Sequence, residues 1–595
     1  ADTWYIEDGD ISISAGTNGN NITQGSTTKE NDTDTVITNR ESTASSNTVT
    51  IDADEGKTVN VTLDNVTINV DEGYEHGYDP NAYKTAVSVT GSGNTNIELN
   101  GNNTLTSGYG HAGLEHNKTD DSGTLTIQDE KNDDGSAKGS ASDTTGSLTA
   151  TGGYHSAGIG GSDEHDGQVT ITGGEITATG GNGGAGIGGG AGDTDAVGGD
   201  GDVTISGGTI TATGGSLGAG IGGGAYGNGT VTVTDGDITA KATGRYGAGI
   251  GGGYGAKPKP SGTLIGGNGT VTISGGTITE ASGGYMAAGI GSGFQGLGTV
   301  TIEGAAVIKN AQGGAAGAGI GSGTRGDSEI IIRGDAVIEN AESSGNGAGI
   351  GSGQGTTSYG ALVPSVGNVT IEGNARIENA KSGSGGSGIG GGFIGIGNVI
   401  IRGNAQIGNA TGGEEGAGIG GGALGTGDVT IEGNVTIENA QGGAGAAGIG
   451  GGAETQPDTK DTRNKVSIKS TEAGSPDITA TGGGASDGSL PGAAAIGSGS
   501  VADGATEVKS DITIEGKVTI NATGGGDVAI GDSINGETQF SGLQVGTTIT
   551  RRNAKGDDVS QPGDVVREQA PTETEAAGAP STGSVEVERP VTVEG

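Results

Sequence analysis

Residues 427–452 read GDVTIEGNVTIENAQGGAGAAGIGGG and hold three short apolar stretches separated by Gly, Asn or Asp. In the first stretch Val429 and Ile431 flank a polar residue, Ile437 lies in the second, and Ile449 lies in the third. Alternation over three to five residues between turn formers predicts β-strands that point these apolar side chains inward. The segment has no 3.6-residue periodicity that would indicate a helix. One such unit therefore predicts three short strands.

This unit recurs along most of the chain. Its third stretch has the form AGIG, and the Ile or its equivalent falls at residues 159, 187, 221, 250, 290, 320, 350, 389, 419, 449, 496 and 530. Four of the intervals are 30 residues, and most longer ones read as the same unit with an inserted loop. A three-strand repeat of this length predicts one coil of a parallel β-solenoid. The predicted fold class is all-β, a parallel β-helix of roughly 12 regular coils plus irregular N-terminal coils.

The composition agrees with a narrow core. Of 595 residues 137 are Gly, 30% are hydrophobic and 3% are aromatic, which is too little apolar mass for the wide core of a large globular enzyme. The absence of Cys excludes disulfides, thiolate metal sites and cysteine nucleophiles. A formal net charge of −43 argues against binding nucleic acid or anionic membranes. The sequence also has no apolar segment suited to membrane insertion.

Four regions are predicted along the chain. Residues 1–150 form an N-terminal cap and wider, irregular coils, 151–535 the regular glycine-rich solenoid, and 536–552 a C-terminal cap. Residues 553–595 read as an acidic Pro/Glu/Thr-rich linker or docking tail. The start at Ala1 resembles a mature terminus from which an export signal has been removed, so we expect an extracellular or cell-surface location.

If coils stack, equivalent residues lie above one another in columns. One column should be an inward asparagine ladder whose amides hydrogen-bond each other, comprising Asn310, Asn340, Asn379, Asn409 and Asn439. Surface asparagines are the alternative. A second column alternates in sign at coil spacing, which predicts cross-strand ion pairs among Glu303, Arg333, Glu372, Arg402 and Glu432.

One acidic loop has the composition of a calcium site. Asp193, Asp195, Asp200 and Asp202 offer four carboxylates among glycines, and oxygen ligands suit calcium. A solvated acidic insert is the alternative for these four. Residues 163–166 form a second acidic cluster with a histidine. The predicted fold requires no cofactor, and calcium is the one ion that the sequence suggests.

Two surfaces are candidates for contact with sugars. Tyr74, Tyr109 and Tyr154, with Tyr78 and Tyr83, fall in the N-terminal region, and exposed aromatic rings on a polar surface are suited to stacking on sugars. These rings could instead cover the wide end of the rod. Threonines in the earlier coils, at residues 170, 204, 232, 272, 177, 179, 211 and 213, form a hydroxyl-rich face.

The GGxIT-ATGG and GAGIGGG units over residues 150–530 resemble the glycine-rich repeats of large secreted surface proteins of anaerobic Gram-positive bacteria. The first 150 residues are loosely similar to a carbohydrate-binding β-helix family related in fold to pectate lyases. For such enzymes the resemblance implies clustered Asp ligands for calcium and an Arg base, and no residues of this sequence match that set.

No catalytic residues are predicted, so the expected function is that of a non-catalytic extracellular β-solenoid: a surface stalk, adhesin or filament subunit. This expectation includes self-association into fibres or surface arrays. A polysaccharide-binding module, with a polysaccharide ligand as partner, is the first alternative. A polysaccharide lyase or hydrolase is the next, and ice binding by the threonine rows is the last.

Overall fold

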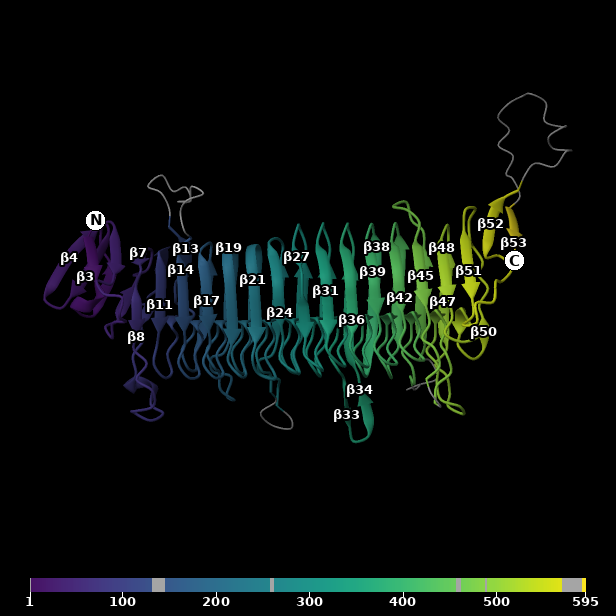
Figure 1. Cartoon of the computed structure of the whole chain (residues 1–595), viewed down its shortest axis with the longest axis horizontal. Helices are drawn as coiled ribbons and strands as arrows, with labels where there is room; N and C mark the ends of the chain where they lie inside the picture. Colours follow the sequence, from purple (N-terminus) through teal and green to yellow (C-terminus); the bar gives the residue numbers. More distant parts are fainter. Residues whose placement is uncertain are drawn as a thin grey trace, which may run out of the picture.

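The computed structural model describes residues 2–130, 145–256, 262–455, 462–486, 489–569 and 591–594. It is an elongated stack of coils in which strands lie across the long axis, with β1–β4 at one end and β52 at the other (Figure 1). Two short 3-10 helices, η1 (Ile6–Asp8) and η2 (Pro80–Ala82), lie in the N-terminal region. The described residues otherwise form strands, turns and loops, which confirms the predicted all-β parallel solenoid.

The first strands of successive coils pair in parallel as one file along the rod. It comprises β1 (Asp2–Tyr5), β5 (Thr35–Thr38), β7 (Thr58–Asp64), β10 (Asn94–Asn100), β13 (Leu125–Asp129), β16 (Asp166–Ile171), β19 (Gly201–Gly214), β21 (Gly229–Ala242), β23 (Gly269–Ile273), β26 (Gly298–Ile302), β30 (Ser328–Ile332), β35 (Ser365–Ile371), β38 (Gly395–Gly403), β41 (Gly427–Gly433), β44 (Asn464–Lys469) and β47 (Ser510–Glu515).

The second strands form another parallel file, in which the later halves of β19 and β21 take part. It comprises β8 (Thr67–Asn69), β11 (Asn102–Thr106), β14 (Ser147–Thr151), β17 (Glu175–Thr179), β24 (Thr277–Ser282), β27 (Val307–Ile308), β28 (Ala311–Gly313), β31 (Val337–Ser343), β36 (Arg376–Ser382), β39 (Gln406–Thr411), β42 (Thr436–Gln441), β45 (Asp477–Thr481), β48 (Thr519–Thr523) and β51 (Thr548–Arg552).

The third file carries the AGIG stretches. It comprises β2 (Ile11–Ala15), β6 (Val49–Asp52), β9 (Val87–Thr90), β12 (Leu114–Lys118), β15 (Ile159–Gly160), β18 (Ile187–Gly188), β20 (Ile221–Gly222), β22 (Ile250–Gly251), β25 (Ile290–Gly291), β29 (Ile320–Gly321), β32 (Ile350–Gly351), β37 (Ile389–Gly390), β40 (Ile419–Gly420), β43 (Ile449–Gly450), β46 (Ile496–Gly497) and β49 (Ile530–Asp532). All twelve isoleucine positions expected from the repeat pair in this file, each with its neighbour one coil away.

Glycine makes this third side possible. Gly420 follows Ile419 with a φ of +135°, a conformation that L side chains rarely adopt. A Cβ there would lie 2.0 Å from the carbonyl oxygen of Gly450 in the next coil. The same contact recurs from coil to coil, so side chains are excluded and the backbones approach closely.

One continuous hydrophobic cluster runs through the stack from Trp4 to Ile549. It is filled almost entirely by Val, Ile, Leu and Ala, and the residues expected to point inward in the quoted repeat, Val429, Ile431, Ile437 and Ile449, are all buried. A core one or two side chains wide therefore suffices for a chain with so little apolar mass, because each coil packs on the coils above and below it.

Antiparallel strands close both ends. At the N-terminus β3 (Asn20–Gln24) pairs with β2, and β4 (Thr27–Asp32) pairs with β3. At the C-terminus β50 (Gly536–Glu537) pairs with β49, β52 (Val565–Glu568) with β51, and β53 (Val591–Glu594) with β52. Strands β52 and β53 belong to the segment predicted as a linker or docking tail; residues 570–590 of that segment lie outside the described residues.

Loops gather along one edge of the rod, and the antiparallel hairpin of β33 (Thr356–Ser358) and β34 (Ala361–Val363) projects from that edge (Figure 1). These loops interlock through backbone hydrogen bonds between coils. The N–H of Phe294, for example, donates to the oxygen of Tyr246 in the preceding coil at 3.0 Å. Side chains on loops of consecutive coils are therefore held next to each other.

Candidate functional sites on the solenoid surface

The alternating charge column is present on the first file. Arg333 Nε donates to Glu303 Oε2 at 2.8 Å, and Arg402 Nε donates to Glu372 Oε2 at 3.0 Å. The column continues beyond Glu432, whose carboxylate lies 3.5 Å from the ammonium group of Lys469. These pairs are partly exposed, so each contributes at most about 1 kcal/mol and acts mainly on register.

The asparagine column is present, but its predicted position in the interior is wrong. Asn379 Nδ2 donates to Asn340 Oδ1 at 3.3 Å, and Asn409 Nδ2 donates to Asn379 Oδ1 at 3.1 Å, as a ladder requires. However, Asn310, Asn340, Asn379 and Asn409 are exposed and Asn439 is half-buried. The residue two after an inward Ile does not point inward here, because the following alanine at 311, 341, 380, 410 and 440 takes the buried position.

In a further column, side-chain oxygens accept hydrogen bonds from backbone N–H groups of the next coil. These residues lie at or just before the start of strands of the first file. Asp166 Oδ1 accepts from the N–H of Asp200, and Asp200 Oδ1 accepts from the N–H of Asn228, both at 2.8 Å. Asn228 and Asn268 continue the series by the same bond to the next coil. This column was missed, although an Asp or Asn before Gly at the start of four consecutive first-file strands was a visible signal.

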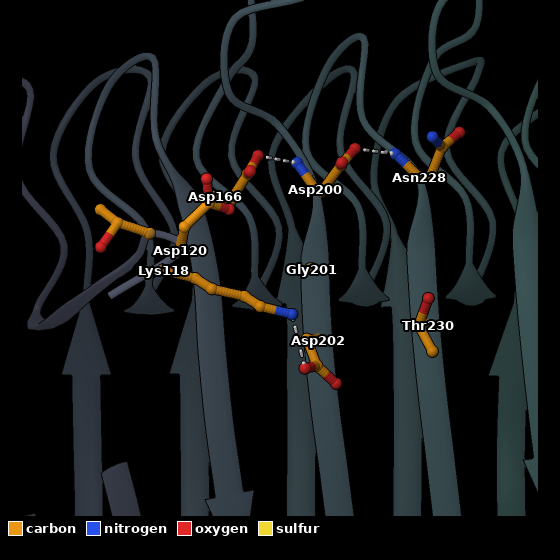
Figure 2. Close-up of a pocket in the computed structure, with 9 residues that line it drawn as sticks. Lys118, Asp120, Asp166, Asp200, Gly201, Asp202, Asn228 and Thr230 are labelled. Atoms are coloured by element: carbon orange, nitrogen blue, oxygen red, sulfur yellow. Dashed lines mark hydrogen bonds and ion pairs between the residues drawn. The ribbon is translucent and has the colours of Figure 1, made fainter. Parts of the chain in front are cut away.

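The structure does not bring the four predicted calcium ligands together. Asp193 Oδ1 accepts from the N–H groups of Asp195 and Val197 in its own turn, and Asp195 is exposed. In Figure 2 the carboxylate of Asp200 faces the backbone of Asn228, whereas Asp202 binds the ammonium group of Lys118 at 2.9 Å. Within the described residues, no group of three or more His, Asp or Glu side chains could hold a metal ion.

The electrostatics of Asp200 agree with a role in capping. Desolvation by the neighbouring coils raises the pKa of Asp200, the Asn228 N–H lowers it, and nearby Asp166 raises it again, with a net upward shift. The acidic pocket in Figure 2 is therefore explained by backbone capping and by the pair between Lys118 and Asp202.

The N-terminal tyrosines do come together. Tyr109 stacks on Tyr154 with ring centroids 5.3 Å apart, and Tyr74 lies 5.7 Å from Tyr109 and 6.4 Å from Tyr154. The N–H of Gly110 donates to the oxygen of Tyr154, which fixes this arrangement. We name Tyr74, Tyr78, Tyr83, Tyr109 and Tyr154 the tyrosine cluster.

Exposure differs within the tyrosine cluster, and the prediction that all five rings are exposed is wrong for two of them. Tyr74 is 60% and Tyr78 78% exposed, but Tyr83 and Tyr109 are each only 6% exposed. The Tyr83 hydroxyl donates to the oxygen of Gly77 at 2.7 Å, so this ring supports the loop that carries Tyr74 and Tyr78. The accessible part of the cluster is therefore Tyr74 and Tyr78, with half-buried Tyr154 beside them.

Two histidines of the N-terminal coils, His111 and His116, have pKa values shifted in opposite directions. Burial disfavours protonation of His111, but Glu115 and the oxygen of Pro80, each at 3.0 Å, outweigh it and raise the pKa of His111 above 6.5. His116 is buried, and this burial lowers its pKa below 6.5 although its Nδ1 lies 2.8 Å from the oxygen of Gln168. Both contacts join neighbouring parts of the stack, which gives these histidines a structural role.

A second group of aromatic residues lies on the loop edge and was missed. Tyr246 lies 4.6 Å from Tyr254 and 5.3 Å from Phe294, and Tyr226 lies 5.3 Å from Tyr254. With Tyr285, we name these five residues the aromatic row. Tyr254 and Phe294 occupy the same offset, four residues after the isoleucine of their repeats, and this recurrence was the available signal.

The threonine columns stack in register. On the second file Thr104, Thr149, Thr177 and Thr211 lie above one another, and a parallel column contains Thr106, Thr151, Thr179 and Thr213. The column is interrupted at Lys241, which pairs with Thr213. On the first file the predicted threonines at 170, 204, 232 and 272 stack without interruption as far as Thr301, where Ile331 follows.

Comparison with known proteins agrees with this architecture. The family described as a beta helix repeat matches residues 146–163, 169–191, 203–225 and 271–294. Comparisons with curated proteins and with solved structures found no match. Over these residues the chain matches beta-helix repeats, in agreement with the parallel stacking of its strands. Among the described residues, no helix has the length and apolarity needed to span a bilayer.

Proposed function

We propose that this chain is a non-catalytic, extracellular structural rod. It serves as a surface stalk or filament subunit, like the secreted surface proteins whose glycine-rich repeats its own repeats resemble. The observation that carries the proposal is the main hydrophobic cluster, which runs unbroken through the stack. Sixteen strands of the third file, at ~4.8 Å per coil, give a rod of about 70 Å. Such a stack resists bending because neighbouring coils share both core contacts and backbone hydrogen bonds.

Surface ladders support the same role. Their ion pairs and amide bonds join equivalent residues of neighbouring coils rather than converging on a point where a substrate could react. The antiparallel strands at both ends cover the first and last coils, so pairing of one rod with the next through free strand edges is disfavoured. Discrete rods, as in a surface stalk, are therefore the expected particle, and a filament subunit would have to associate through lateral contacts.

Negative-stain images of the full purified chain would test this proposal. We expect straight rods of uniform length, and surface exposure would be checked by antibody labelling of intact cells of the source organism. Long fibres would instead support the filament subunit. Flexible or globular particles, or release of unsaturated product from a uronate polymer in the presence of calcium, would contradict a structural rod.

The tyrosine cluster favours a second candidate function, polysaccharide binding. Exposed Tyr74 and half-buried Tyr154 lie edge to face with ring centroids 6.4 Å apart, on buried supports that fix them before a ligand arrives. A glycan array with the full chain would test this function. Binding of a plant, mucin or cell-wall glycan should be lost in Tyr74→Ala, and the exposed Tyr359→Ala is the matched control.

A further inference from the structure

The aromatic row is built by the interlocked loops and is not part of the solenoid core. The Tyr246 oxygen accepts from the N–H of Phe294, and the Tyr254 oxygen accepts from the N–H of Tyr226, which sets their rings side by side across three coils. Phe294 is 8% exposed, yet it packs on Tyr246 and Tyr254 and does not belong to the continuous core cluster. The Phe294 ring is thus buried beneath the tyrosine rings of the row and supports them.

The remaining rings of the aromatic row reach the surface. Tyr285 is 50% exposed, and Tyr226, Tyr246 and Tyr254 are half-buried. Half-buried rings with fixed neighbours lose little conformational entropy when a ligand stacks on them.

Two arginines flank the row. The Arg245 guanidinium lies 5.4 Å from the centre of the Tyr285 ring, and that of Arg325 lies 5.7 Å from the centre of Phe294. Both are exposed. Backbone bonds again set the arrangement, because Met286 N–H donates to the Arg245 oxygen at 2.7 Å and so brings Tyr285 beside Arg245.

Within the part of the chain that the structure describes, these two arginines lack a carboxylate partner, which most arginines of this acidic chain have. Arg40, Arg333, Arg376, Arg402, Arg463 and Arg551 each contact a carboxylate. Arg245 and Arg325, like Arg552 near the C-terminal end, have no carboxylate within ion-pair distance among the described residues, although acidic side chains outnumber basic ones 71 to 28. Stacking on a ring orients a guanidinium group. Its N–H edge stays free to bind one oxyanion through two parallel hydrogen bonds.

From this combination we propose that the aromatic row, with Arg245 and Arg325, is a binding site for an anionic polysaccharide. The rings stack on the apolar faces of sugar units, and each guanidinium binds a carboxylate or sulfate group of the chain. Arg245 and Arg325 stand on coils two steps apart, a separation of about 10 Å along the rod. A polymer lying along the loop edge would therefore present charged groups from non-adjacent sugar units to the two arginines.

The acidity of the whole chain does not prevent such binding. At physiological ionic strength charges more than about 8 Å away are largely screened, so the two local cations dominate the interaction with a bound polyanion. Binding should weaken as salt increases, because part of it is electrostatic. The stacking contribution should persist at higher salt.

The test is a binding titration of the full chain with polygalacturonate, dextran sulfate, neutral dextran and polyglutamate. The double variant Arg245→Gln/Arg325→Gln is compared with Arg333→Gln/Arg402→Gln, which removes the same charge from exposed ladder positions. We expect the first variant to bind the anionic polysaccharide at least about tenfold more weakly, because both charge-assisted contacts are lost; this fold-change corresponds to about 1.4 kcal/mol. The control should change by less than about twofold.

Further arms separate the alternatives. Tyr285→Ala should also weaken binding, while Tyr74→Ala, in the separate tyrosine cluster, should not; the two glycan proposals can thus fail independently. Tighter binding of dextran sulfate than of polygalacturonate would support the site and identify sulfate as its anion. Absence of binding to both anionic polysaccharides, equal losses in the two double variants, or polyglutamate bound as tightly as the sugars would overturn the proposal.

Discussion

At the scale of single residues, the packing of one coil on the next depends more on backbone conformation than on side-chain chemistry. Glycines after the third-file isoleucines adopt a φ near +135°, and carbonyl oxygens of the next coil occupy the space of a side chain. On the loop edge, Tyr226, Arg325 and Leu424 adopt positive φ values of 57°, 62° and 63° at equivalent positions. Because such conformations cost about 1–3 kcal/mol in non-glycine residues, the interlocking bonds between loops must hold them in place.

We predict that Gly420→Ala is severely destabilising. Its Cβ would lie 2.0 Å from the Gly450 oxygen, so the coils must separate locally, at a cost of at least about 3 kcal/mol. Thermal unfolding and limited proteolysis of the full chain would measure this loss. Gly484→Ala is the control, because a Cβ there meets no atom within 4 Å. Equal stability of the two variants would contradict the close packing of this side.

Histidine titration provides a second prediction at this scale. His111, with its raised pKa, stabilises the fold below pH 6.5, and this contribution is lost as pH rises through its folded pKa. His116, with its lowered pKa, destabilises the fold as pH falls below 6.5 towards its folded pKa. NMR of selectively labelled histidines should show one titration above and one below 6.5, assigned with His111→Gln and His116→Gln. Coincident titrations at 6.5 would contradict both environments.

At the scale of elements, the end of the rod depends on one buried cation. Arg551 on β51 is fully buried and contacts Glu537 at 2.9 Å and Asp564 at 2.8 Å. These contacts join β51 to β50 and to the residue before β52. The Arg551 guanidinium also lies 5.3 Å from the ring of Phe540, which packs on the core.

Arg551→Met should release this end of the rod. It leaves two shielded carboxylates without a cation, which costs about 3–5 kcal/mol. Hydrogen exchange should show faster exchange over β49–β52, with the central coils unchanged because each coil contacts only its neighbours. Arg552→Met is the control, since Arg552 is exposed on the same strand. Unchanged exchange at the C-terminal coils would show that the ion pairs do not hold this cap.

The strands of the repeat could be predicted from the sequence, whereas the surface sites could be predicted only in part. Alternation around Val429 and the spacing of Ile419 and Ile449 are local signals, and parallel stacking follows from them. The direction of Asn379 and the burial of Tyr109 depend on the shape of turns, which the pattern does not encode. Similarly, Tyr246 and Phe294 meet through a bond between loops 48 residues apart.

At the scale of the whole molecule, the rod behaves as a one-dimensional array in which sequence position sets axial position. The charge column therefore imposes a condition on coil number. Glu372, Arg402, Glu432 and Lys469 alternate in sign over four consecutive coils. Removing an odd number of coils from this region places like charges above one another, and removing an even number does not.

Deletion of residues 389–448, two coils, should accordingly be tolerated better than deletion of residues 389–418, one coil. The single deletion places Glu372 against Glu432, and the double deletion places it against Lys469. We expect the difference to be about 0.5–1 kcal/mol per contact in favour of the double deletion, reduced by salt. Thermal unfolding at two ionic strengths would measure it. Greater stability of the one-coil deletion would show that the column has no influence on register.

The hairpin of β33 and β34 shows how such a rod can diversify. It lies within an interval of 39 residues between Ile350 and Ile389, yet both isoleucines pair in register and the first-file strands on either side pair without a shift. An insertion at the loop edge therefore leaves the strand pairing around the core unchanged. Evolution or an engineer can graft new segments there, one per coil, and display them at regular intervals along a scaffold that need not be redesigned.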